Sequence, residues 1–584
     1  MKKKILVAGL LIILTSCRRM PQDVSLETLD PMEEEYEEER KDIIKKLSFR
    51  DEMEFPVFGI PDNPLNLNPM TYSDEASSII VHTLYRNLFE IRNNGIDTVL
   101  EMDLLKEFKN IDDERFILQL KNDLKWDDGQ DLTVDDIIYS IEYTYDHRTN
   151  YQDNFIVHGK KPILNKIDDH KMEILLDEPS TSFVYYLRDL LPIPKHIFLE
   201  NNKRSYGLEK EFLVGNSSYK YYEEVFDTDF GTNRIIFKIN PHYELEKPDF
   251  ERMDYRVTGY SETDTSRYDM EAYNINGGYI ESYDPGAFTN EFYNVYPTEG
   301  KLISLLFKTN TKNGGDPEIR KALATMITPS YIQGNYGSDT YVARANSLFT
   351  PNNPYRFREG VFRSTDPGEG IRALKKMQMG NPDFKLRFGF ILDIGKPDEK
   401  AAITLQETFR NLGVNLEVIP LFREEFYAIL RDPHQDVFDF CLFEMDAEDN
   451  PYEYRHLFRK DDPRNYSGFE DEELMAMWEQ ADQMRDKDER MKAYGKIQER
   501  ILDDHVIVPM TYTLKPLVLD ERFFNVEEAI PDNHSFVKYF EKLKFEEEII
   551  TDEMKKEYEI KDKDLEKERP YDNVNIKDLD KIED

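Results

Sequence analysis

The stretch that decides the fold is LKWDDGQDLTVDDIIYSI, which runs from Leu124 to Ile141. The pair Asp128-Gly129 predicts a turn, because Asp-Gly favours one strongly. Thr133 is suited to cap a helix, and Asp136 follows three residues later, close to the arrangement of a capping box. Apolar residues then recur at the spacing of one helix face, at Ile137, Ile138, Ile141 and Tyr145. The stretch therefore predicts a turn followed by an amphipathic helix.

Strands and helices alternate further along the chain, most clearly between residues 385 and 446. Apolar periodicity predicts, in order, a strand at 386–392, a helix at 401–412, a strand at 414–418, a short helix at 424–430 and a buried strand at 437–443. This alternation implies an α/β fold with a largely parallel sheet. Ligands of such sheets bind beyond the carboxyl ends of the strands, which is where Glu444, Met445 and Asp446 lie.

Composition limits the possible partners of the chain. Its 584 residues carry 117 acidic and 76 basic side chains, a formal net charge of −41. This length predicts two or three domains, and an aromatic content of 12% is enough for a sizeable core. The acidic balance argues against nucleic acid as the main partner and against non-specific binding to anionic lipid. Two cysteines rule out a disulfide scaffold.

Both ends of the chain differ from its body. A basic start and an apolar run precede Leu14-Thr15-Ser16-Cys17, which resembles the lipobox of bacterial lipoproteins. That resemblance implies a signal peptide at 1–16 and lipid on Cys17; the alternative is a simple signal peptide or an anchor with an incidental cysteine. Six glutamates between Glu33 and Glu39 fit an acidic linker over 17–50. The charged segment 549–584 is predicted to be a tail.

No catalytic template fits the chain. It contains no P-loop, HExxH, GxSxG or CxxC motif, and no two histidines stand four residues apart. The glycines at 368–370 match a loose dinucleotide pattern, but Asp366-Pro367 explains them better as a helix start. Cys441 lies inside an apolar run and is predicted to be a core residue. We expect no enzyme activity, no cofactor and no metal.

The stretch 124–141 is similar to the signature of the family 5 extracellular solute-binding proteins of oligopeptide, dipeptide and nickel ABC transporters. Other segments resemble motifs of the same family: 65–69 with 84–88, Pro194-Lys195-His196-Ile197, Asn240-Pro241-His242-Tyr243 with Lys247-Pro248, the helix 316–323, and Asn465 to Phe469 with Pro509. The chain departs from the family pattern at 214–219, at Glu281 and at Met475. These departures bear on ligand class and loop shape.

The resemblance implies a two-lobed periplasmic-binding-protein-like fold of type II, hinged around a ligand cleft. We name its predicted parts the first lobe (51–75, 190–302 and 510–548), the extra domain (76–189) and the second lobe (303–509). Closure of the lobes would bury the ligand and present a new surface to a permease. The partners implied are a peptide, ABC permease subunits and a membrane held through Cys17, with the protein itself a monomer.

Asp446 is the candidate ligand-binding residue. It follows the predicted buried strand, and it matches the first Asp of a family segment, here DAEDNP from Asp446 to Pro451 with one extra residue. In peptide-binding members that Asp holds the peptide's α-ammonium; the alternative is a strand-end Asp that caps a turn. Arg320 is predicted to be structural, and Trp126 and Gly129 to be turn and packing residues.

The sequence thus favours an extracytoplasmic substrate-binding lipoprotein of an ABC importer, on the periplasmic or cell-surface side, that captures peptides. Two alternatives stay open. One is the same scaffold with a nickel chelate or an oligosaccharide as cargo, and the other is a surface sensor or adhesive lipoprotein.

Overall fold

The computed structural model describes residues 54–546, except 94–97, 152, 201–212, 228–231, 259–274, 280–292, 337–341, 352, 357–365, 393–396, 433, 447, 461, 532–533 and 535. Cys17, the acidic segment 17–50 and the tail 549–584 lie outside the described residues. Residues Glu52–Glu547 form one compact unit. The predicted bounds of the two lobes and the extra domain therefore stay a prediction.

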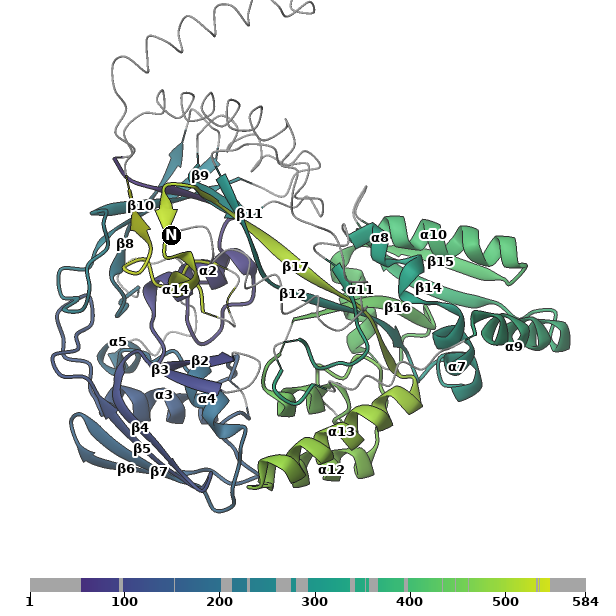
Figure 1. The fold of residues 1–584 in the computed structure, drawn as a ribbon, viewed down its shortest axis with the longest axis horizontal. Coiled ribbons are helices and arrows are strands. Elements are labelled where there is room, and N and C mark those ends of the chain that lie inside the picture. Colours follow the sequence, from purple (N-terminus) through teal and green to yellow (C-terminus); the bar gives the residue numbers. More distant parts are fainter. Residues whose placement is uncertain are drawn as a thin grey trace, which may run out of the picture. The chain divides into compact units, whose positions relative to one another are not determined.

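One mixed sheet runs through this unit (Figure 1). Its order among the described residues is β15-β14-β16-β12-β17-β11-β1-β10-β9-β8, and β13 pairs with β17 outside that path. The strands are β1 (Val57–Ile60), β8 (Tyr219–Asp227), β9 (Thr232–Ile239), β10 (Arg252–Val257), β11 (Gly277–Tyr279), β12 (Tyr293–Phe307), β13 (Val342–Arg344), β14 (Leu386–Ile391), β15 (Leu416–Leu421), β16 (Phe440–Asp446) and β17 (Ile507–Asp520). The sheet therefore contains strands of both predicted lobes.

The long strands β12 and β17 link the two halves of the sheet. They pair antiparallel from Tyr293 opposite Asp520 to Leu306 opposite Ile507, with register shifts near the middle. Gly300 lies at one of these shifts, and a Cβ there would come within 2.0 Å of the Thr513 carbonyl oxygen. Only glycine allows so close an approach of the two backbones.

The second lobe confirms the predicted α/β alternation and corrects one boundary. Strands β14, β15 and β16 are parallel, with α10 (Pro397–Leu412) and α11 (Arg423–Arg431) between them. The predicted strand 437–443 is wrong by three residues, because β16 begins at Phe440 and continues to Asp446 by pairing with β12. The apolar run extends beyond the strand because Phe438, which precedes β16, is also buried and packs against Phe426. Beyond β16 the sheet continues antiparallel through β12 and β17, and parallel pairing returns where β1 lies beside β10 and β11, so the sheet is mixed and not largely parallel.

Residues 76–189 contain two smaller sheets. Strands β4 (Leu105–Ile111), β5 (Arg115–Leu120), β7 (Lys171–Leu175) and β6 (Ile163–Asp168) form one of them, and β2 (Phe89–Asn93) with β3 (Thr98–Met102) forms the other. The predicted turn leads into α3 (Val134–Asp146), and both capping-box hydrogen bonds between Thr133 and Asp136 are present. The remaining helices of this region are α2 (Glu75–Leu84), which begins at its edge, and α4 (Phe183–Asp189). The stretch that decides the fold therefore adopts the predicted local structure.

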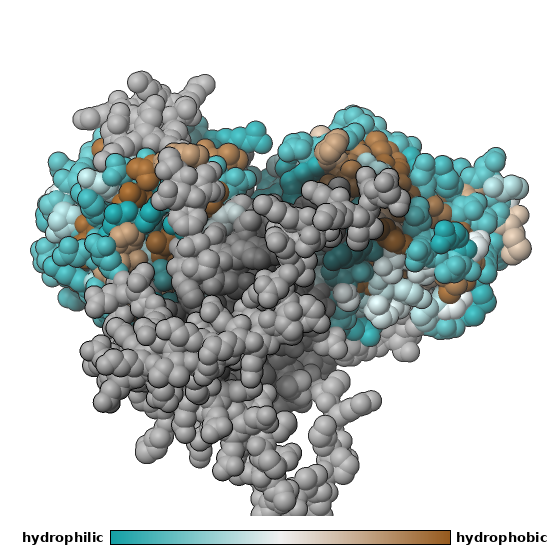
Figure 2. All heavy atoms as spheres, turned by 90° about the horizontal axis from the view of Figure 1, so that it is seen from above, coloured by the Kyte–Doolittle hydropathy of each residue, from teal (hydrophilic) through white to brown (hydrophobic). Residues whose placement is uncertain are grey.

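Other helices cover the second lobe: α7 (Pro317–Met326), α8 (Gln333–Tyr336), α9 (Pro367–Gly380), α12 (Glu472–Gln483) and α13 (Lys487–Asp504), with the 3-10 turns η3 (Pro329–Tyr331) and η4 (Pro451–Leu457). Helix α9 begins at Asp366-Pro367, which confirms the helix-start interpretation of the glycines at 368–370. None of the helices in the described ranges is long and apolar enough to cross a bilayer. On the face drawn in Figure 2, the described surface is mostly hydrophilic with scattered apolar residues.

Candidate ligand-binding site

Asp446 is the last residue of β16, at the carboxyl end of the three parallel strands. Its side chain is 83% exposed, and its Oδ1 lies 3.8 Å from the Nζ of Lys301 on β12. Lys301 is its cross-strand neighbour, and the same Nζ lies 3.9 Å from Glu444 Oε2. One ammonium therefore faces two carboxylates, which leaves this corner of the sheet with net negative charge.

The chain after Asp446 turns back into the protein. The side-chain amide of Asn353 donates to the carbonyl oxygens of Glu448 and Asp449, at 3.1 Å each. Asn450 then caps η4 by accepting a hydrogen bond from the Tyr452 N–H at 3.2 Å. These bonds fix the loop between β16 and η4, and with it the acidic side chains that it carries.

A group of carboxylates concentrates negative charge on this loop. Burial raises the pKa of Glu448 well above the usual carboxyl range, and the nearby charges of Glu453, Asp189, Asp449 and Asp446 raise it further. Like charges in a partly desolvated place disfavour one another and favour an added cation. A cation placed beside these carboxylates would oppose this shift and favour the ionised form of Glu448.

The extra domain contributes a buried arginine to the same place. Arg188, at the end of α4, forms an ion pair through Nη1 with Asp449 and a second one through Nε with Asp189 at 2.7 Å. Its side chain is 3% exposed, and its carbonyl oxygen accepts a hydrogen bond from the Asn87 amide. Burial dominates at Asp189 and raises the pKa of its carboxyl despite Arg188. Arg188 thus joins the extra domain to the acidic loop of the second lobe.

A second buried network fastens the extra domain to the carboxyl-terminal segment of the first lobe. Lys538 Nζ donates to Glu90 Oε1 at 2.7 Å, and the Tyr539 hydroxyl lies within hydrogen-bond distance of Glu90 Oε1 at 2.7 Å and of Asp103 Oδ2 at 3.0 Å, with one hydrogen to donate. Arg86 forms ion pairs with Asp103 and Glu541. Buried charges of this kind are tolerated only when they are paired, so these contacts hold the extra domain against the first lobe.

Two imidazoles lie close to this network. The rings of His82 and His534 are 4.3 Å apart in an edge-to-face arrangement. Burial lowers both pKa values well below the usual histidine range, and the charge of Lys538 lowers both further. Within the described residues, no group of three or more His, Cys, Asp or Glu side chains is placed to hold a metal ion.

The remaining residues that the sequence singled out have structural roles. Arg320 is buried, and its guanidinium donates to the carbonyl oxygens of Asp504, Gly314 and Gly315, in agreement with the prediction. Cys441 is buried in β16, and burial raises the pKa of its thiol.

Trp126 and Gly129 also agree with their predicted role in a packed turn. Trp126 is fully buried. Gly129 has a φ of +90°, and a Cβ there would lie 3.2 Å from the ring of His242. This position therefore favours glycine for both its backbone conformation and its space.

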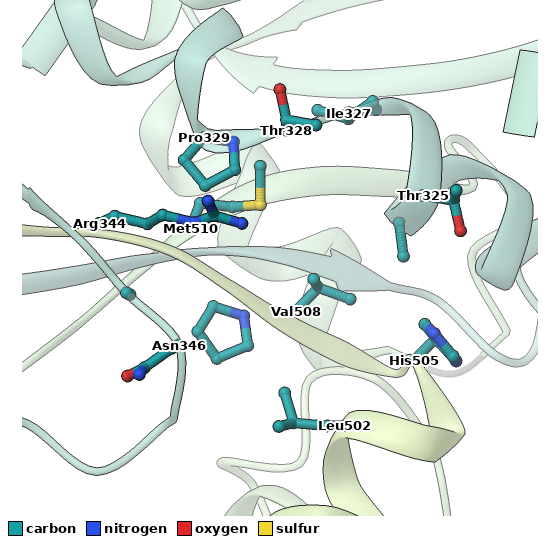
Figure 3. Close-up of a pocket in the computed structure, with 13 residues that line it drawn as sticks. Thr325, Ile327, Thr328, Pro329, Arg344, Asn346, Leu502, His505, Val508 and Met510 are labelled. Atoms are coloured by element: carbon teal, nitrogen blue, oxygen red, sulfur yellow. The ribbon is translucent and has the colours of Figure 1, made fainter. Parts of the chain in front are cut away.

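A shallow pocket elsewhere on the second lobe does not include these residues. Figure 3 shows its lining, which includes Ile327, Thr328, Pro329, Arg344, His505 and Met510. It lies where the end of α7 and η3 meet β17, and neither Asp446 nor the loop after it lines it. We therefore place the candidate site at the carboxyl end of β16 and not in this pocket.

Sequence reasoning proposed Asp446 as the candidate and missed the residues that surround it. Asp449 stands in the segment quoted for Asp446, and Arg188 stands shortly before the motif at 194–197, but no local pattern marks either as a partner of the other. Their contact joins positions 261 residues apart in the chain. The burial of Arg188 and its pairing with Asp449 become apparent only from the three-dimensional structure.

The chain resembles known proteins over most of its length. Residues 99–465 match the family model described as bacterial extracellular solute-binding proteins, family 5 middle. The periplasmic oligopeptide-binding protein OppA of Salmonella typhimurium is 22% identical over 464 residues, which cover 73% of this chain and 82% of that protein.

Solved structures share the fold. The ABC transporter substrate-binding protein CtaP from Listeria monocytogenes superposes with a TM-score of 0.74 and 25% identity, over 84% of this chain and 99% of CtaP. The oligopeptide-binding protein AppA from Bacillus subtilis, solved in complex with a nonapeptide, gives a TM-score of 0.68 and 17% identity over 84% of this chain and 99% of AppA. The two-lobed α/β fold is therefore that of periplasmic binding proteins.

Proposed function

The chain belongs to the family 5 bacterial extracellular solute-binding proteins, and we propose that it captures peptides for an ABC importer. In this proposal the peptide binds in a cleft between the two lobes, and the closed protein delivers it to the permease subunits. The family match over residues 99–465 supports the transport role. Peptide cargo is supported by the oligopeptide-binding relative OppA and by the nonapeptide complex of AppA. Delivery of this kind needs no bond chemistry.

The observation that carries the choice of peptide is the charge at the end of β16. A receptor for many peptides must take its reliable contacts from groups that all peptides share, such as the terminal α-ammonium. Asp446 presents an exposed carboxylate next to the group of Glu448, Asp449, Asp189 and Glu453. We propose that Asp446 pairs with the α-ammonium, and that the net negative charge of Asp446 and Glu444 beside the single Lys301 favours this pair.

The proposal extends to the ends of the chain. Residues 1–16 would be removed as a signal peptide, and Cys17 would carry the lipid that holds the protein on the outer side of a membrane. The acidic segment 17–50 would keep the binding unit away from the lipid surface, because like charges extend a linker. The protein would act as a monomer that docks on its permease after closure.

Mass spectrometry of the molecules that co-purify with the protein from its native cells tests the cargo. The protein is captured under native conditions, washed, denatured, and its small molecules are identified. Peptides with free amino termini are the expected result. A nickel chelate or an oligosaccharide in stoichiometric amount, with no peptide, would contradict the proposal and support the alternative cargo.

A further inference from the structure

Asp482 lies in α12 of the second lobe, but its carboxylate is bonded to the extra domain. The residue has no exposed surface. Its Oδ2 accepts a hydrogen bond from the Ser180 hydroxyl at 2.7 Å. Its Oδ1 accepts hydrogen bonds from the Thr181 hydroxyl at 3.1 Å and from the backbone N–H of Ser182 at 2.8 Å. Three donors of one segment therefore converge on one buried carboxylate of another.

Neighbouring groups extend this contact. The backbone N–H of Thr181 donates to the carbonyl oxygen of Asp482 at 3.0 Å. The Gln483 side-chain amide donates to Glu178 Oε2 at 2.8 Å. Residues 178–182 thus run along the end of α12 with both backbone and side-chain bonds.

Helix α4 continues the contact to the binding loop. The Tyr186 hydroxyl accepts a hydrogen bond from Arg455 of η4 at 3.2 Å, and Arg188 pairs with Asp449. The segment that begins at Ser180 therefore bonds to the second lobe at its start, at its middle and at its end. None of these groups is assigned to the ligand in the proposed function.

The extra domain is bonded to both lobes, so separation of the lobes must break one set of bonds. The network of Arg86, Glu541, Lys538 and Glu90 joins the extra domain to the first lobe through buried ion pairs. The contact of Asp482 joins it to the second lobe. If the lobes separate by bending of β12 and β17 while the ion pairs to the first lobe stay intact, Asp482 and residues 180–182 become exposed to water. Water would then replace their mutual hydrogen bonds.

We propose that residues 180–182 and Asp482 form a clasp that stabilises the closed arrangement of the two lobes even before ligand binds, while the open arrangement stays accessible. A buried carboxylate with three donors is stable only while those donors are in place. The clasp therefore shifts the equilibrium between open and closed protein toward the closed form. When more of the ligand-free protein is already closed, less of the binding free energy is needed to close it, and the apparent affinity is higher. In this way the extra domain would influence the affinity of the cleft.

Hydrogen exchange in ligand-free protein tests the clasp directly. The full chain is freed of ligand by dialysis from denaturant and refolding, and exchange is followed at the amides of Thr181 and Ser182. Asp482→Ala should speed their exchange at least about ten-fold, because one hydrogen bond to a charged group is worth about that factor. Asp439→Ala is the matched control. Asp439 is equally buried in the second lobe, but its carboxylate is bonded to Arg387 and Asn313 of the same lobe.

X-ray scattering of the same proteins distinguishes a clasp from a local contact. Asp482→Ala should increase the radius of gyration of the ligand-free protein, and Asp439→Ala should leave it unchanged. The double variant Ser180→Ala/Thr181→Val removes two donors from the opposite side and should repeat the result even where Asp482→Ala folds poorly. Unchanged exchange, or faster exchange with an unchanged radius, would overturn the proposal. Because no ligand is used, this outcome is independent of which cargo the cleft binds.

Discussion

Arg188 and Asp449 form a buried ion pair between the extra domain and the second lobe, with side chains that are 3% and 9% exposed. The pair lies at the base of the loop that carries Asp446 and Glu448. It therefore links the position of the proposed ammonium site to the position of α4. A ligand that binds at Asp446 therefore contacts a segment that an ion pair with the extra domain already fixes in place.

Loss of this pair should be costly. Arg188→Met keeps much of the side-chain volume but leaves Asp449 buried without its partner, which typically costs about 3–5 kcal/mol. Urea unfolding of the two proteins measures the difference. Arg115→Met is the control, because Arg115 is 51% exposed in its pair with Glu173 and such pairs contribute about 0–1 kcal/mol. Similar losses of unfolding free energy for the two variants would show that the buried Arg188 pair stabilises the protein no more than an exposed pair does.

Asp446→Asn should weaken the binding of peptides with free amino termini and affect N-acetylated peptides much less. The change nearly preserves shape while it removes the charge that the α-ammonium pairs with. In the proposal, closure over the ligand removes this exposed carboxylate from water, and loss of one partner of such a pair typically costs about 2–5 kcal/mol. Calorimetry with one peptide in both forms and both proteins gives the coupling energy.

Glu444→Gln is the matched control for this cycle. Glu444 lies on the same strand and faces the same Lys301 at 3.9 Å, but it lies two residues before the strand end. The coupling should be large for Asp446 and small for Glu444. A coupling at Asp446 within about 0.5 kcal/mol of zero would favour its role as a turn residue at the strand end.

His158 should make the clasp depend on pH. Its Nε2 lies 3.5 Å from Asp482 Oδ2, and this interaction raises the histidine pKa above its ordinary value, while burial opposes the shift. Glu178 and Glu479 raise the pKa further, and the ring of Tyr452 lies beside the imidazole. A raised pKa means that the stabilisation is fully present below about pH 6.5 and is lost as pH rises through the pKa of His158.

Melting of the ligand-free protein measures this dependence. His158→Gln should lower the melting temperature more at pH 6 than at pH 8.5, because the stabilisation is lost as pH rises through the pKa of His158. The same difference in melting temperature between the two proteins at both pH values would mean that His158 contributes through packing alone.

Cys17→Ser should release the protein from the membrane fraction. Lipid on one cysteine supplies the proposed attachment, and the acidic segment after it gives no attraction to anionic lipid. Cell fractionation together with labelled fatty acid measures both effects. Normal incorporation of label into the Cys17→Ser protein would refute the lipid site.

Local elements could be predicted from the sequence because their signals are local. The capping box at Thr133 and Asp136, the cap at Asp316 and the helix stop at Gly413 with its φ of +70° all occur where the pattern indicates. The predicted start of β16 is wrong because an apolar run indicates burial, and Phe438 is buried without being part of the strand.

The contacts between the extra domain and the second lobe could not be predicted in this way. Asp482 reaches residues that lie about 300 positions earlier in the chain. In a chain with 117 acidic residues, no spacing distinguishes this aspartate from the others. The pairing of β12 with β16 and β17, which sets the place of Asp446, likewise depends on strands far apart in sequence.

The central claim is that the cleft recognises the charged amino terminus of a peptide, and calorimetry of the wild-type protein tests it most directly. A peptide that co-purifies with the protein is synthesised with a free and with an acetylated amino terminus, and the two dissociation constants are compared. Acetylation should weaken binding at least about 30-fold, as expected for loss of one partner of a charge pair that the closed lobes remove from water. Equal affinity for the two peptides would contradict it.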